Sequence, residues 1–138
     1  MIAKYIWVFG SLIFIILGTI HLVYTFFTNK FSSKNRKVIT EMKSSHPILT
    51  EETTIWKAWI GFNASHSVGV MFIGVINFYL AFEYFSTLQS DHFFFLFNIL
   101  IISFYVWLAK MYWFKIPLLG TLIALICYIS SYSVILMN

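Results

Sequence analysis

Four long apolar runs constrain this chain more than any other feature of its sequence. They extend over residues 5–27, 50–84, 93–113 and 117–137. Each run is long enough to cross the roughly 30 Å hydrocarbon core of a bilayer as a helix, and backbone groups in lipid must be hydrogen-bonded within the segment. The sequence therefore predicts an all-α membrane protein with four transmembrane helices in an antiparallel bundle, forming a single domain.

Composition supports a membrane protein and excludes a soluble one. The chain is 60% hydrophobic and 10% charged, whereas soluble domains carry about 25% charged residues. Basic residues cluster on one side of the predicted bundle, where eight of the nine lie: Lys30, Lys34, Arg36, Lys37, Lys43, Lys57, Lys110 and Lys115. Only Lys4 lies on the other side. The positive-inside rule then predicts cytoplasmic basic connections and both termini outside the cytoplasm.

The long connection, over about residues 28–49, is expected to contain a short cytoplasmic amphipathic helix. Ser33 is its expected cap, and it runs to about Lys43, with Val38, Ile39 and Met42 at helical spacing. Basic residues surround that apolar stripe. The helix therefore either lies on an anionic inner leaflet or connects the membrane helices in solvent.

The second membrane helix is expected to begin at Thr50. A threonine there is a suitable N-cap, and Glu51 and Glu52 in the first turn favour the helix dipole. A helix from Thr50 to Tyr84 is longer than the bilayer core, so its first turns are expected to protrude.

Polar residues are found within the first two membrane helices. His21 and Thr25 lie on the first helix, and Asn63, His66 and Ser67 lie on the second. Both histidines fall about 10 Å inside the predicted inner boundary. Polar groups at membrane depth are costly and often mark a working site. These residues are therefore expected to form one ligand-binding site in the inner half of the bundle.

The sequence leaves the role of this polar site open. The side chains either hydrogen-bond the helices together or bind the headgroup of a lipid or quinone. A third alternative is that His21 and His66 hold haem b or a metal ion, which implies an electron carrier or membrane oxidoreductase. No acidic or thiol ligand accompanies the histidines, which weakens the metal alternative. Hydrolysis is disfavoured, because His66 and Ser67 are adjacent and do not face each other on a helix.

Small residues predict how the helices pack. Gly18 belongs to a polar and aromatic stripe of the first helix that is expected to face inward. On the second helix, Gly61, Ser65 and Gly69 form a separate line, away from the stripe that holds Asn63. This small-xxx-small spacing makes the line a candidate homodimer face.

The run Trp-Lys-Ala-Trp-Ile-Gly-Phe-Asn-Ala-Ser-His-Ser, at residues 56–67, resembles the signature of an uncharacterised family of small bacterial four-helix integral membrane proteins. Gly-Thr-Ile-His-Leu, at residues 18–22, is similar to that family's first helix. A looser resemblance, carried by the Gly-x-x-His pattern, is to DoxX-like membrane proteins. The resemblance covers roughly residues 1–80, and it implies this topology and draws attention to His21, Asn63 and His66.

The resemblance implies no activity. The leading expectation is therefore a non-enzymatic accessory or lipid/quinone-binding subunit of a bacterial inner membrane, with no catalytic residue. Its expected partners are membrane lipids and either further copies of the chain or a larger membrane complex, with no nucleic acid.

Overall fold

The computed structural model describes residues 1–137 and is all-α over that range. Five helices follow one another in the described chain: α1 (Ile2–Phe27), α2 (Arg36–Ser44), α3 (Ile55–Leu88), α4 (His92–Tyr112) and α5 (Lys115–Leu136). In residues 1–137, four of them are long and apolar enough to cross a membrane, with lengths of 26, 34, 21 and 22 residues for α1, α3, α4 and α5. The predicted all-α membrane bundle is confirmed.

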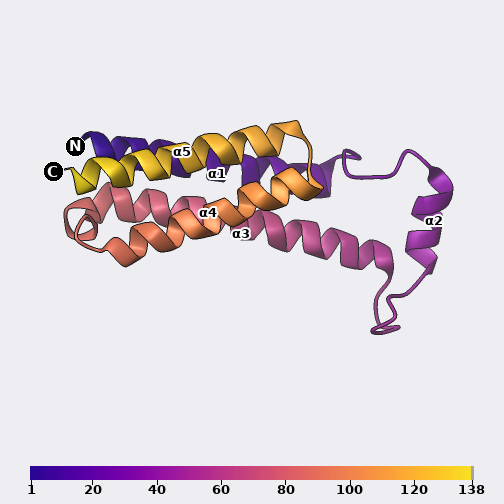
Figure 1. The fold of residues 1–138 in the computed structure, drawn as a ribbon. Coiled ribbons are helices and arrows are strands. Elements are labelled where there is room, and N and C mark those ends of the chain that lie inside the picture. The colour runs from indigo at the N-terminus through magenta and orange to yellow at the C-terminus, as the bar shows by residue number, and fades with distance from the viewer. Residues whose placement is uncertain (138) are drawn as a thin grey trace. The chain divides into compact units, whose positions relative to one another are not determined.

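The chain forms two compact units. The first comprises Met1–Leu17 and Val70–Asn138, and the second comprises Gly18–Gly69. The first unit thus holds the beginning of α1, the end of α3, and all of α4 and α5. Its successive helices run in opposite directions, and a short turn joins α4 to α5 (Figure 1). The second unit holds the rest of α1 and α3, with α2 in the connection between them.

Aromatic side chains form the core of the first unit. Trp7, Phe14, Phe95 and Tyr128 are fully buried. The ring of Trp7 lies 3.9 Å from that of Tyr128 and 4.7 Å from that of Phe95, measured between centroids. Ser11 is also buried, and its Oγ lies 2.9 Å from the Tyr128 hydroxyl. Trp7, Ser11 and Phe14 of α1 therefore face the interior of the first unit.

A chain of polar contacts crosses the same core. Trp7 Nε1 donates to Asn77 Oδ1 at 3.1 Å, and Asn77 Nδ2 donates to Asn98 Oδ1 at 2.7 Å. These bonds join α1, α3 and α4. Asn77 is 1% exposed, so its amide has exchanged water for partners inside the bundle. Each of these hydrogen bonds forms only when its two side chains lie at matching heights along their helices. The three linked side chains therefore fix the register of the three helices.

Two helix starts differ from the sequence prediction. α3 begins at Ile55 rather than at Thr50, because residues 45–54 form a closed loop in which Ile55 N donates to Ser45 O at 2.9 Å. Thr50 Oγ1 accepts from Glu52 N within that loop, and Thr54 Oγ1 accepts from Lys57 N at the helix start.

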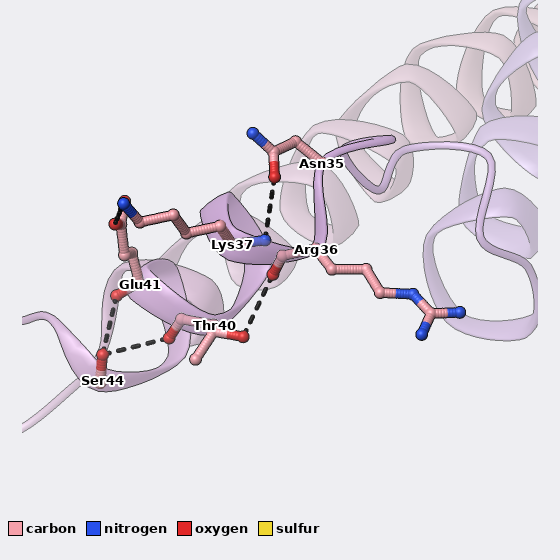
Figure 2. Close-up of polar contacts among 6 residues, drawn as sticks. All are labelled: Asn35, Arg36, Lys37, Thr40, Glu41 and Ser44. Atoms are coloured by element: carbon pink, nitrogen blue, oxygen red, sulfur yellow. Dashed lines mark hydrogen bonds and ion pairs between the residues drawn. The ribbon is translucent and has the colours of Figure 1, made fainter.

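The short helix α2 also begins later than the predicted Ser33. Asn35 is its N-cap and accepts a hydrogen bond from Lys37 N (Figure 2). Ser33 Oγ instead accepts from Asn35 N and so holds the turn before the helix. Asparagine is as good an N-cap as serine. Because the Ser33 side chain is used in the preceding turn, Asn35 caps the helix instead.

The other helix ends lie close to the prediction. α3 continues to Leu88, but Tyr84, the predicted last residue, has non-helical torsions of φ −121° and ψ 18°. α5 begins at Lys115, which leaves Pro117 in its first turn as expected. The turn before α4 is held by Asp91, whose side chain accepts from Phe94 N at 3.1 Å.

Candidate functional site

The second unit brings together three of the polar residues that the sequence singled out. His21 of α1 lies opposite Asn63 of α3, with 3.0 Å between His21 Nε2 and Asn63 Oδ1. The ring of His66 meets the ring of His21 edge to face, with 5.3 Å between centroids. The two histidines therefore lie at one level of the helix pair, and the amide of Asn63 links α3 to α1.

Asn63 determines which nitrogen of His21 carries the proton. Asn63 Nδ2 donates to the carbonyl oxygen of Trp59 at 2.8 Å, so the amide oxygen faces the imidazole. An amide oxygen only accepts, and Nε2 of His21 must therefore donate. A neutral His21 then has its acceptor at Nδ1.

Thr25 and Ser67 contact the backbone of the same residues. Thr25 Oγ1 donates to His21 O at 2.8 Å, and Ser67 Oγ donates to Asn63 O at 2.7 Å. Because each hydroxyl proton is used within its own helix, both oxygens remain acceptors only. Ser67 is fully buried, whereas Thr25 is half-buried and borders an open crevice.

This crevice has a volume of about 170 Å³. Its walls come from the last turn of α1, the residues after it, and the first turns of α3: Tyr24, Thr25, Phe26, Thr28, Asn29, Phe31, Ser32, Trp56, Trp59, Ile60 and Asn63. Thr25 and Asn63 are two of the polar residues that line it. His21 lies behind the lining, bonded to Asn63. We call this space the Asn63 crevice.

A more apolar hollow adjoins the Asn63 crevice. Its volume is about 330 Å³, and it is lined by Phe31, Ser32, Ser33, Met42, Trp56 and Trp59. Phe31, Ser32, Trp56 and Trp59 line both spaces. A molecule with a polar ring and an apolar extension therefore finds a surface of each kind within one unit.

Sequence reasoning did not find Phe31 and Ser32. Phe31 lies in the connection after α1, and its ring packs 4.5 Å from that of His21 and 6.1 Å from that of Tyr24. The chain folds back over the end of α1 at this point. A bulky apolar residue inside a basic, polar connection was the only available signal for such a contact.

The histidine pair does not fit haem b. Bis-histidine ligation requires a porphyrin between the two imidazoles, whereas these rings are in direct edge-to-face contact at 5.3 Å. His21 Nε2 is also directed at Asn63 rather than at an iron position. In residues 1–137, no three histidine, cysteine, aspartate or glutamate side chains gather closely enough to hold a metal ion.

The predicted packing residues divide between two environments. Gly18 is buried, as expected for the inward stripe. Gly61 and Ser65 are exposed, and a Cβ placed on Gly61 would have no neighbour within 4 Å in the described chain. Gly69 is half-buried. The line that begins at Gly61 is thus an open face of α3.

A separate hollow lies in the first unit. It measures about 300 Å³ and is bordered by Met1, Lys4, Tyr5, Phe82, Glu83, Phe85, Ser86 and Gln89. Lys4 Nζ donates to Phe82 O at 2.6 Å and also lies 4.8 Å from the centroid of the Phe82 ring. Lys4 thus joins the beginning of α1 to the end of α3, and its ammonium group interacts with the protein itself.

Comparison of the chain with models of protein families, with curated proteins and with solved structures finds no match.

Proposed function

We propose that the chain is a non-enzymatic membrane protein that binds the headgroup of a quinone or a similar ring-bearing lipid in the Asn63 crevice. The observation that carries this proposal is the combination of aromatic walls, formed by Tyr24, Phe31, Trp56 and Trp59, with the polar groups of Asn63 and Thr25. Binding sites of this kind are mostly apolar, with a few polar groups that fix orientation.

The size of the crevice matches a single ring. Its volume is about 170 Å³, and a protein cavity of about 150 Å³ accepts benzene. Aromatic side chains stack on planar rings, so the walls favour a flat headgroup over a branched one. The adjoining apolar hollow accommodates the first part of an isoprenoid or acyl chain.

The site has one donor and one acceptor that can bond to the oxidised quinone and to the reduced quinol, respectively. Asn63 Nδ2 has a second proton beyond the one given to Trp59 O, and it can donate to a quinone carbonyl. Thr25 Oγ1 has already donated its proton to His21 O, and it can accept from a quinol hydroxyl. His21 holds the Asn63 amide in place for the first of these bonds.

Fluorescence titration of the purified full chain with a short-chain benzoquinone tests this function. Trp56 and Trp59 line the crevice, so bound quinone is expected to quench their emission in a saturable way. Asn63→Ala removes one hydrogen bond of about 1 kcal/mol, and the Kd is expected to rise about fivefold to tenfold.

Ser65→Ala is the matched control, because Ser65 lies on the exposed side of α3 and its hydroxyl donates to Phe62 O within the same helix. Its Kd is expected to equal that of the unaltered chain. Quenching that increases linearly without saturation would contradict the proposal, and so would equal affinities for the Asn63→Ala and Ser65→Ala variants. Displacement of the quinone by phospholipid at the same concentration would favour a phospholipid over a quinone as the ligand.

The proposal also includes location and orientation. We place the protein in a bacterial inner membrane, with α2 in the cytoplasm and the beginning of α1 outside, because eight of nine basic residues lie on the α2 side. Reporter fusions after α5 test this orientation: activity of a periplasmic reporter supports it, and activity of a cytoplasmic reporter contradicts it.

Two further elements of the proposal concern relatives and partners. We assign the chain to the small bacterial four-helix membrane proteins whose signature residues 56–67 resemble. We also assign it an accessory role in a homo-oligomer or a larger membrane complex, and the open face at Gly61 and Ser65 supports contact with another membrane helix.

A further inference from the structure

The connection between α1 and α3 links two helices that are each long and apolar enough to cross a bilayer. Residues 28–54 join the end of one spanning helix to the start of another. Between positions 28 and 45 this connection carries five basic residues and one acidic residue: Lys30, Lys34, Arg36, Lys37, Lys43 and Glu41. Two further acidic residues, Glu51 and Glu52, follow in the loop that leads to α3. Residues 28–45 therefore present positive charge beside lipid headgroups.

Three of these basic side chains interact with other residues of the protein. Lys37 Nζ lies 3.9 Å from Glu41 Oε1, Lys30 lies over the ring of Tyr24, and Lys43 lies over the ring of Trp56.

Lys34 and Arg36 are exposed and have no acidic or aromatic partner in the part of the chain that the structure describes. Figure 2 shows the Arg36 guanidinium directed away from the Lys37–Glu41 pair. These two cations are available to an external anion.

The apolar stripe of α2 is partly used by the protein itself. Met42 lines the hollow that Trp56 and Trp59 also line, and Ile39 is half-buried. Val38 is 37% exposed, so α2 presents only this part of its stripe outward, next to its basic residues.

A second, apolar feature lies in the loop that follows α2. Ile48 and Leu49 are 109% and 92% exposed. The loop is closed at its base by the bond from Ile55 N to Ser45 O and by a 2.8 Å contact between His46 Nδ1 and Thr53 O. It projects sideways from the start of α3 (Figure 1). The two side chains thus form the apolar tip of a pinned loop.

We propose that residues 34–49 bind the surface of an anionic lipid bilayer: Lys34 and Arg36 contact lipid phosphates, and Ile48 and Leu49 insert between headgroups. Charge complementarity and the two flanking membrane helices support this occupant. A nucleic acid would also attract the cations, but it offers nothing apolar to cover the tip. A bilayer interface satisfies both features.

Hydrogen exchange of the full chain in lipid nanodiscs tests the proposal. Phosphatidylglycerol-containing discs are compared with pure phosphatidylcholine discs at low salt. Each basic residue near an anionic surface strengthens the attraction to it, so amides of residues 34–49 are expected to exchange at least about tenfold more slowly in the anionic discs. About 0.5 M salt should remove most of that difference.

Substitutions distinguish binding by residues 34–49 from a general effect of the protein's positive charge. The double variant Lys34→Gln/Arg36→Gln is expected to abolish the protection from exchange. The double variant Ile48→Ser/Leu49→Ser is expected to reduce the protection at residues 46–50. Lys110→Gln with Lys115→Gln removes the same charge outside the segment, and it should leave the protection unchanged.

Equal exchange in the two lipids would overturn the proposal, as would full protection in the Lys34/Arg36 variant. Stronger protection by an added oligonucleotide than by anionic lipid would also overturn it, in favour of a nucleic-acid partner. None of these outcomes depends on whether the Asn63 crevice binds a quinone.

Discussion

At the scale of single residues, asparagine amides on α3 form hydrogen bonds to other helices in both units. Asn77 accepts from Trp7 and donates to Asn98 in the first unit, and Asn63 joins His21 to α3 in the second. Both asparagines also donate to the carbonyl oxygen four residues earlier. Each amide is thereby oriented by its own helix before it contacts another, which makes the cross-helix bond specific.

Glycine substitutions on α3 give a matched test of packing. A Cβ on Gly74 would lie 2.7 Å from the backbone nitrogen of Ile15 and 2.9 Å from Ser11 O, and backbone atoms cannot move aside cheaply. Gly74→Ala is expected to lower the free energy of unfolding by about 1–3 kcal/mol, measured by reversible SDS unfolding followed by circular dichroism.

Gly61→Ala is the control on the same helix. Its Cβ would meet nothing within 4 Å, and alanine is favoured over glycine in a helix by about 0.8–1.0 kcal/mol. This variant is expected to be as stable as the unaltered chain or more stable. A Gly74→Ala variant that matches Gly61→Ala in stability would show that α1 and α3 do not approach closely at Gly74.

At the scale of elements, the helices were predictable and some of their ends were not. Long apolar runs determine which segments cross the membrane, so four spanning helices could be derived from the sequence alone. The start of α3 could not be derived, because it depends on the bond from Ile55 N to Ser45 O. Thr50 has the side chain of an N-cap, but its place in the closed loop prevents it from starting a helix.

The cap of α4 gives a test at this scale. Asp91→Ala removes the side chain that accepts from Phe94 N, and we expect a loss of about 1 kcal/mol of unfolding free energy in the same SDS assay. Asp91→Asn keeps an oxygen acceptor and is expected to retain most of the stability. Equal losses in both variants would indicate that the carboxylate charge, rather than the hydrogen bond, stabilises the start of α4.

At the scale of the whole molecule, the stripes of α1 and α3 predicted which residues would meet, but not what surrounds them. His21, Asn63 and His66 could be grouped from helix direction and depth. Asn98 could not be linked to Asn77, because a single asparagine in the phenylalanine-rich α4 defines no stripe.

The Asn63 crevice depends on Phe31 and Ser32, which lie in a connection with no periodic pattern. Its existence is decided by how the chain folds back over α1, and this is a tertiary contact that local sequence patterns do not encode.

Photo-cross-linking with an azido-benzoquinone tests the central claim, binding in the Asn63 crevice, most directly. The full chain is irradiated in detergent, digested, and mapped by mass spectrometry, with unlabelled quinone as competitor. We predict that the azido-benzoquinone labels the segments 24–32 and 56–63, which contain the residues that line the crevice, and that unlabelled quinone reduces this labelling. Labels confined to the hollow near Lys4 and Phe82, or labels that the competitor does not reduce, would contradict the account.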